Sequence, residues 1–377
     1  MEFALTREHE MLRKMVGDFV ESEVTPRAEA LDEAGDFPFD LVKKSADLGL
    51  VGMINSKDNG GTQMGHLARM ITIEEVSRIY PSLGFFFQTG HLAMYILEGK
   101  GTDEQKERYL PSLCRGETIS CTAITEPSGG SDLSGTQTTA ELDGDDYVIS
   151  GRKVFTTLGG VADVACVVAK SGDGFSVLLV DKETPGFEIP HREPRSGLRS
   201  LPVNELSFTN CRVPRTNLIG AEGRGLGVAI GAVGAIGRTG AAGVGLGIAE
   251  GVYEIALKFA KERKLYGKPI FDLQAVQFAL VDIDVEIEAA KWLCYYSAWL
   301  LDQGKTAREA STEIARAKLF TVDVANRASL KAVQLMGAYG LSPEFQVERR
   351  FNDALELFAA AGTREIMKVT IGASLAR

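Results

Sequence analysis

The period of the apolar positions divides the chain into three stretches. Residues 1–118 place apolar residues three and four apart between turn signals such as "EAGDFPFD" and "PSLG", which predicts helices. Residues 119–224 contain short apolar runs bounded by Gly, Asp or Pro, which predict strands: "YVISGRKVF", "VADVACVVAK", "FSVLLVDKE" and "NELSFTNCRVP". From residue 225 to residue 377 the helical spacing returns.

Three helical stripes are clear enough to predict buried faces. An N-terminal amphipathic helix carries Met11, Leu12, Met15, Val16, Phe19 and Val20 on one side. Two further helices carry the stripes Val252, Ile255, Ala256 and Phe259, and Leu280, Ile283, Ile287, Ala290 and Cys294. The last stretch is therefore expected to form a helical bundle.

The middle stretch predicts an antiparallel sheet or barrel, because its strands follow one another through short turns with no helices between them. No repeat or low-complexity linker separates the three parts. We therefore expect a multi-domain α+β protein with domains at residues 1–118, 119–224 and 225–377.

Composition and charge narrow the function. The 377 residues include 41 Lys and Arg against 51 Asp and Glu, and the net charge of -10 disfavours a nucleic-acid partner. The five cysteines are odd in number, far apart and never in CxxC spacing, which predicts neither a disulfide framework nor a metal site. The N-terminus resembles neither a signal peptide nor a spanning helix, so we expect a cytoplasmic protein, although a trimmed organelle matrix protein would show the same pattern.

The glycine-rich stretch "GRGLGVAIGAVGAIGRTGAAGVGLGIAEG" does not predict a dinucleotide site. Gly225 and Gly227 begin a G-x-G-x-x-G pattern, but Ile230 occupies its third position, and Ile248 does the same after Gly243 and Gly245. No strand leads into the stretch, as such a site requires. Because each glycine costs a helix about 1 kcal/mol, we expect close packing against another helix or a flat ligand.

The segment "AITEPSGGSD", residues 123–132, is a candidate ligand loop. Its turn residues open the backbone, and Thr125 and Ser131 add hydroxyl donors. Such a loop suits a ligand rich in acceptors, for example a flavin edge with a phosphate. The same composition also fits an ordinary surface turn.

Five segments in order resemble the signatures of the acyl-CoA dehydrogenase family, over essentially the whole chain. They are "TAITEPSGGSD", "GRKVFTTLGGVAD", "KERKLYGKPI" followed by "LQAVQF", "AVQLMGAYG" and "AAGTREI". The resemblance implies an N-terminal helical domain, a middle antiparallel β domain and a C-terminal four-helix bundle. It also implies a noncovalent FAD, an acyl-CoA substrate, an electron-transfer flavoprotein as electron acceptor, and a homotetramer built as a dimer of dimers.

Site residues follow from the same resemblance. On the flavin side it implies Thr122, Ile124, Thr125, Ser131, Phe155 and Thr157. Arg263, Gln274, Gln334 and Ala338 would contact FAD, with the first three reaching that of a neighbouring subunit, and Thr363 and Glu365 would flank the FAD phosphates or adenosine. The substrate side comprises Ser131, Gly237, Arg238 and Ala361.

The chain departs from the family pattern at its most important positions. Phe155 replaces the usual Trp, and Ala235 replaces an Asp that often precedes the helix Arg. Most relatives carry the catalytic Glu directly before the last Gly-Thr, where this chain has Ala361, and branched-chain and long-chain relatives carry it at the position of Gly237. General-base catalysis typically contributes about 10²- to 10⁴-fold, and neither residue can supply it.

Three explanations stay open from the sequence. The base could be relocated to "GFFFQTGHLAMYILEGKGT", where His91 is the best proton acceptor and Glu98 a weaker one. This fits a cyclic substrate such as cyclohex-1-ene-1-carboxyl-CoA, because Gly237 and the run Ala359 to Ala361 leave volume for a bulky acyl group. The others are different flavin chemistry, such as desulfination or monooxygenation, and a non-catalytic flavin-binding subunit.

Overall fold

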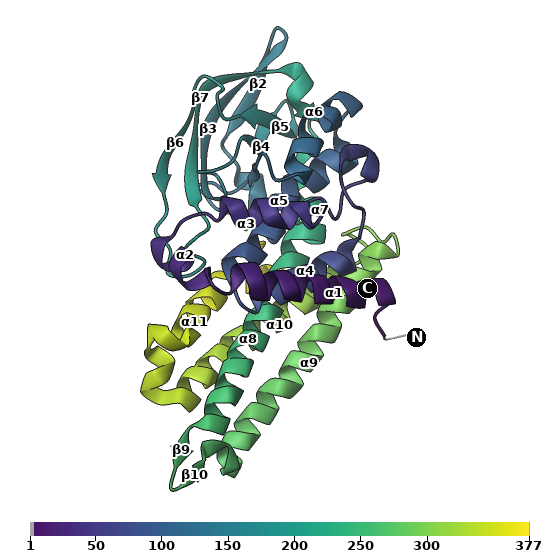
Figure 1. Ribbon diagram of the computed structural model, residues 1–377. Helices are drawn as coiled ribbons and strands as arrows, with labels where there is room; N and C mark the ends of the chain where they lie inside the picture. Colours follow the sequence, from purple (N-terminus) through teal and green to yellow (C-terminus); the bar gives the residue numbers. More distant parts are fainter. Residues whose placement is uncertain (1–3, 377) are drawn as a thin grey trace.

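The computed structural model describes residues 4–376 and shows three regions (Figure 1). A β domain lies at one end, the N-terminal helices cross the middle, and a bundle of long helices extends to the other end. The predicted α+β architecture of helical, β and helical parts is confirmed.

The N-terminal helices end where the sheet begins. They are α1 (Arg7–Phe19), α2 (Ala28–Ala34), α3 (Phe39–Asp47), α4 (His66–Ser77), α5 (Pro81–Lys100) and α6 (Asp103–Cys114). Helix α6 begins with a capping box between Thr102 and Gln105. The predicted stripe of α1 buries Leu12, Val16 and Phe19, but Met11 is 62% exposed, so that part of the prediction was wrong.

One sheet holds all the strands of the β domain. They are β1 (Ser120–Ala123), β2 (Thr139–Asp143), β3 (Asp146–Thr157), β4 (Val164–Ser171), β5 (Gly174–Asp181), β6 (Phe187–Arg192), β7 (Val203–Pro214) and β8 (Leu218–Ile219). The order is β6-β7-β3-β2-β4-β5-β8, with β1 on β4. The β1 and β2 pairings with β4 are parallel, so the sheet is mixed rather than purely antiparallel. Parallel strands need a long connection, and residues 124–163, which include β2 and β3, join β1 to β4.

Strand β3 is interrupted by a bulge that turns a side chain outward. Its register against β7 shifts between Lys153 and Thr156. At the bulge Phe155 has φ 53° and is 60% exposed. A positive φ is uncommon for a bulky residue and is often found at functional sites.

The bundle comprises α7 (Gly225–Ala232), α8 (Thr239–Glu262), α9 (Gln274–Asp302), α10 (Ser311–Met336), α11 (Val347–Glu356) and α12 (Arg364–Leu375). A π-helical segment, Val233–Arg238, joins α7 to α8, and the hairpin β9 (Lys264–Leu265) and β10 (Lys268–Pro269) follows α8. The predicted stripe of α9, from Leu280 to Cys294, is buried.

The glycine-rich stretch packs tightly against α4, as predicted. A Cβ on Gly247 would lie 2.4 Å from the carbonyl oxygen of Glu74, and one on Gly251 would lie 2.2 Å from that of Arg78. The helix Gly225–Glu262 is long and apolar enough to cross a membrane by composition alone. Because 67% of its most apolar window is buried inside the protein, we assign it to the core.

Candidate active site

A buried ion pair fastens the loop 124–132 to the bulge of β3. Lys153 Nζ lies 2.7 Å from Glu126 Oε1 and donates to the Ile124 carbonyl at 3.0 Å. Burial lowers the pKa of Lys153; hydrogen bonds outweigh burial at Glu126 and lower its pKa. The Val154 amide also donates to the Thr125 carbonyl at 2.9 Å. The two segments implied to face the flavin therefore form one unit.

Two threonine hydroxyls at this unit are buried without partners. Neither Thr122 Oγ1 on β1 nor Thr156 Oγ1 on β3 has a hydrogen-bond partner among residues 4–376. Buried hydroxyls are normally satisfied, so a ligand with polar atoms is expected here. Together with the exposed aromatic ring of Phe155, they fit the edge of a flavin.

The other residues predicted on the flavin side lie at the same edge. Ile124 and Thr125 follow β1 directly and are half-buried, Ser131 is exposed on the loop, and Thr157 ends β3 opposite Val203. The predicted cluster is thus brought together within the β domain.

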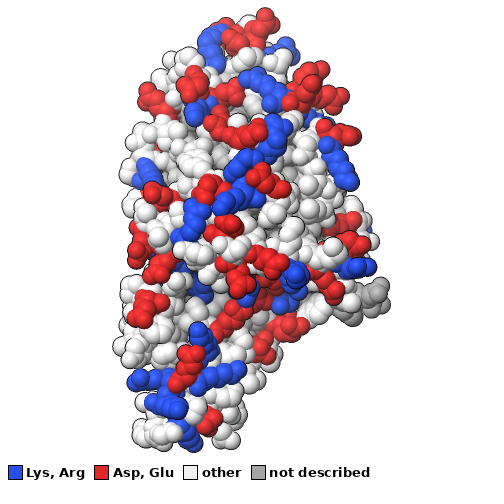
Figure 2. All heavy atoms as spheres, in the orientation of Figure 1, with Lys and Arg blue, Asp and Glu red and all other residues white. Residues whose placement is uncertain are grey.

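The residues predicted to reach a neighbouring subunit lie elsewhere, in the bundle. Arg263, Gln274, Gln334 and Ala338 are all exposed, and Arg263 lies over the Tyr339 ring at 5.4 Å. The β9–β10 hairpin beside Arg263 lies at the end of the bundle remote from the β domain (Figure 1). Figure 2 shows basic side chains gathered at this end and both signs intermixed over the rest of that face. Within one chain, the flavin-side cluster lies in the β domain and these four residues lie in the helical bundle.

Thr363 and Glu365 begin the last helix. Thr363 caps α12 by accepting from the Ile366 amide at 3.4 Å, and Glu365 is exposed in the first turn. Between them Arg364 pairs with Asp323 at 2.8 Å.

The predicted substrate residues Gly237, Arg238 and Ala361 converge. A Cβ on Gly237 would lie 3.2 Å from Ala361 Cβ, so the two family positions for a carboxylate meet at one point. Arg238 Nε donates to the Ala361 carbonyl at 3.4 Å, and burial lowers the pKa of Arg238. Neither position carries a carboxylate.

Gln88 occupies the space beside these two positions. Its Nε2 donates to the Gly237 carbonyl at 3.2 Å and would lie 3.4 Å from a Cβ on Gly237. Thr89 Oγ1 donates to Gln88 Oε1 at 2.5 Å. Gln88 and the Ala361 methyl group therefore occupy the space directly beside Gly237.

His91 has no ring nitrogen left for a substrate. Its Nε2 donates to the Val51 carbonyl at 2.7 Å, and its Nδ1 accepts from Arg69 Nε at 3.0 Å. Burial and the charge of Arg69 lower the pKa of His91 to about 3. These contacts argue against the predicted base, since a base needs a lone pair facing the proton that it removes.

Glu98 is also committed to the fold. It accepts from Asn55 Nδ2 and Asn59 Nδ2, each at 3.0 Å, and from the Ser56 amide at 3.4 Å. It therefore holds the 55–59 turn against α5, and these contacts argue against its role as the weaker candidate base.

Three family models together match nearly the whole chain. They describe the N-terminal domain of acyl-CoA dehydrogenase at residues 6–117, its middle domain at 121–211 and its C-terminal domain at 223–376. The chain belongs to the acyl-CoA dehydrogenase family. Members of this family are flavin-dependent oxidoreductases acting on CH–CH bonds, and FAD is their cofactor.

Individual relatives share the full length. The chain is 38% identical to the short-chain specific acyl-CoA dehydrogenase of Clostridium acetobutylicum, covering 100% of both chains. It is 36% identical to cyclohex-1-ene-1-carbonyl-CoA dehydrogenase of Syntrophus aciditrophicus, covering 98% of this chain and 90% of the relative. Among solved structures, butyryl-CoA dehydrogenase of Megasphaera elsdenii superimposes with a TM-score of 0.96 at 32% identity, covering 100% of both.

Lys318, which sequence reasoning missed, lies beside the acyl-CoA dehydrogenase site. Its Nζ donates to the Gly362 carbonyl at 2.7 Å, and burial lowers its pKa to about 8. Lys318 thereby fixes the turn that carries Ala361. No local pattern singles it out, because Lys318 is one of several charged residues on α10.

Thr156 and Gln88 were missed for a different reason. Thr156 points inward only because of the β3 bulge, and Gln88 becomes important only when α5 meets the π-helical segment. The family motif nevertheless led to the neighbourhood of Thr156, and the hypothesis of a relocated base led to that of Gln88.

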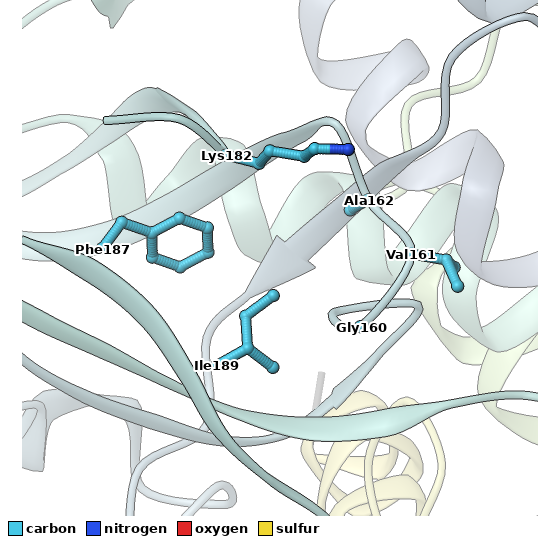
Figure 3. Close-up of a pocket in the computed structure, with 6 residues that line it drawn as sticks. All are labelled: Gly160, Val161, Ala162, Lys182, Phe187 and Ile189. Carbon is cyan, nitrogen blue, oxygen red and sulfur yellow. The ribbon is translucent and has the colours of Figure 1, made fainter. Parts of the chain in front are cut away.

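A surface pocket of about 280 Å³ lies between the turn that follows β3 and strand β6 (Figure 3). Gly160, Val161 and Ala162 line it together with Lys182, Phe187 and Ile189. Lys182 pairs with Asp163 at 3.3 Å, and Phe187 stacks on Phe208. None of the predicted site residues lines this pocket.

Proposed function

We propose that this FAD-dependent oxidoreductase acts on a short acyl-CoA thioester without a protein carboxylate at Cα. The observation that carries the proposal is the meeting of Gly237, Ala361 and Gln88. These residues fill the point at which the family's base would stand. The 38% identity to a short-chain specific relative supports a short acyl group.

Two groups of residues in the chain would bind the cofactor and the substrate. The hydroxyls of Thr122 on β1 and Thr156 on β3 would hold the flavin edge, and Phe155 would lie against it. Arg238, in the second group, would supply positive charge for the CoA moiety, next to the turn fixed by Lys318. When bound, FAD would supply the acceptor for the hydride from Cβ. The proton of Cα would pass to a water molecule, because Gly237 and Ala361 carry no carboxylate.

A cyclic acyl group is the alternative substrate. The relative from Syntrophus supports it by its name, whereas Gln88 and the Ala361 methyl group leave less room directly beside Gly237 than its missing side chain suggests. Matched straight-chain and cyclic thioesters separate the two.

The partners follow from the family and from one exposed face. Helix α9 exposes Phe278, Val281, Val285, Tyr296 and Trp299. An apolar surface of this extent favours burial against another subunit. We infer a homotetramer in which Arg263, Gln274 and Gln334 reach the FAD of a neighbour. The electron acceptor we infer is an electron-transfer flavoprotein.

The test is an anaerobic titration of the purified holoenzyme with butyryl-CoA and with cyclohex-1-ene-1-carboxyl-CoA. Bleaching of the oxidised flavin with formation of the enoyl thioester supports dehydrogenation, and the faster thioester decides between short and cyclic acyl groups. Flavin that remains oxidised with both thioesters would contradict the proposal and favour different flavin chemistry.

A further inference from the structure

Arg69 is a buried cation without an anion. Its side chain lies in the core at 1% exposure, and no Asp or Glu of residues 4–376 lies within 4.0 Å of its guanidinium. All of its recorded acceptors are neutral: His91 Nδ1, Thr239 Oγ1 and the carbonyls of Phe87 and Ile236. A buried charge without a counter-ion is costly, so the site is incomplete as it stands.

The cation lies directly behind the proposed acyl site. Arg69 contacts the π-helical segment at Ile236, one residue before Gly237. A Cβ on Gly240 would lie 2.6 Å from Arg69 Nη2 and 2.6 Å from Gln88 Cγ. Gly240 therefore leaves room for both side chains, and Thr89 is hydrogen-bonded to Gln88. Arg69, Gln88 and Thr89 thus form one buried polar cluster, which we call the polar wall.

Not all hydrogen-bond donors of the polar wall are used by the described residues. The four recorded hydrogen bonds of Arg69 use four of its five N–H groups, leaving one on Nη1 without a recorded partner among the described residues. The Gln88 amide uses one of its two N–H groups on Gly237. Two free donors and one positive charge match the two oxygens of a carboxylate.

The charge of the site is thus opposite to that of a site with a catalytic carboxylate. Ala361 and Gly237 contribute none, Arg69 contributes a cation, and burial disfavours that charged form, which lowers the Arg69 pKa to about 9. Both His66 and His91 are near enough for Arg69 to lower their pKa values, and neither can neutralise a cation.

We propose that the natural acyl group is anionic and carries a carboxylate that the polar wall binds, with Arg69 as the specificity-determining cation. This inference rests on the proposed function, because it names the substrate class of the same site. It also accounts for an arginine where an acyl chain without charge would need only apolar contacts.

The experiment uses CoA thioethers, which bind without being dehydrogenated because they lack the thioester carbonyl. S-butyl-CoA and S-(3-carboxypropyl)-CoA have the same chain length and differ in the terminal carboxylate. Their dissociation constants for the holoenzyme are measured by isothermal titration calorimetry. We expect the carboxylated thioether to bind at least about tenfold more tightly, which is about 1.4 kcal/mol.

Two variants and a control test whether Arg69 causes the tighter binding of the carboxylated thioether. Arg69→Met should abolish it, whereas Arg69→Lys should retain part of it. Arg115→Met removes an exposed arginine that pairs with Glu117 and should leave it unchanged. A preference that survives in Arg69→Met would overturn the assignment to Arg69. If that variant does not fold, the comparison of the two thioethers in the unaltered protein still decides.

Failure of the inference and failure of the proposed function look different. Tighter or equal binding of S-butyl-CoA by the unaltered protein shows that Arg69 only holds the carbonyls of Phe87 and Ile236 together. In that case the thioester site stands and the anionic acyl group is refuted. Binding of neither thioether by a FAD-loaded protein refutes the thioester site itself.

Discussion

Arg69 Nε donates a 3.0 Å hydrogen bond to Nδ1 of His91, and this bond fixes the tautomer of the imidazole. The proton of His91 must then lie on Nε2, where it is donated to the Val51 carbonyl. The histidine is a neutral part of the core. His91 therefore cannot act as the base in place of the missing carboxylate.

The buried neutral state of His91 predicts a pH dependence of stability. Its pKa is about 3 in the folded protein and about 6.5 when unperturbed, so the unfolded chain binds a proton more readily. Stability should fall as the pH decreases from about 6.5 towards 3. In urea unfolding at pH 7 and pH 5, His91→Asn should reduce the difference between the two midpoints. The exposed His191→Asn variant serves as the control. An equal difference between the two midpoints in both variants would contradict the prediction.

The unpartnered hydroxyls predict a loss of FAD affinity. Thr122→Val and Thr156→Val each remove one hydrogen bond to the cofactor, worth about 1 kcal/mol or roughly fivefold in the dissociation constant. Fluorescence of released flavin during dilution measures the change. Ser77→Ala is the matched control, because Ser77 Oγ is also buried without a hydrogen-bond partner among residues 4–376 but lies against Gly84, outside the β domain. Unchanged affinity in both test variants would refute the flavin assignment of these hydroxyls.

The buried pair Lys153–Glu126 predicts a non-additive effect. Lys153→Met leaves a buried carboxylate unpaired and should destabilise the protein by about 3 kcal/mol or more. The double variant Lys153→Met with Glu126→Gln should recover part of this loss, since no buried charge remains. Chemical denaturation of the four proteins in the cycle measures the coupling. Simple additivity would show that the two side chains act independently.

Backbone strain at Ala361 predicts a stabilising substitution. Ala361 has φ 54°, and this left-handed conformation costs a non-glycine residue about 1–2 kcal/mol. Ala361→Gly should relieve more than glycine loses through unfolded-chain entropy, which is about 0.4–1 kcal/mol. The thermal midpoint should therefore rise slightly. Ala360→Gly, at a neighbour outside the left-handed region, should lower it, and a fall in both variants would contradict the strain argument.

The sequence predicted most of the fold because its periodicity is strong. The buried stripe of α9, the succession of strands from β2 to β7 and the close packing of the glycine-rich helix all follow from local spacing. The parallel pairing of β1 with β4 was not predictable, since it depends on where a long connection returns to the sheet.

The site was predictable only in part. The family motifs led to the flavin-side cluster and to the empty positions 237 and 361. Whether His91 was free depended on two long-range contacts, to Val51 and Arg69. Arg69 on α4 looks in the sequence like an ordinary helix charge, and only the packing of α4 against α5 and the π-helical segment buries it.

The most direct measurement is the rate of anaerobic flavin reduction by butyryl-CoA in Ala361→Glu relative to the unaltered protein. This substitution places a carboxylate at the point shared by positions 361 and 237. General-base catalysis at Cα should increase the rate by about 10²-fold or more. An unchanged rate in Ala361→Glu, with loss of reduction in His91→Ala, would contradict the account and return the base to His91.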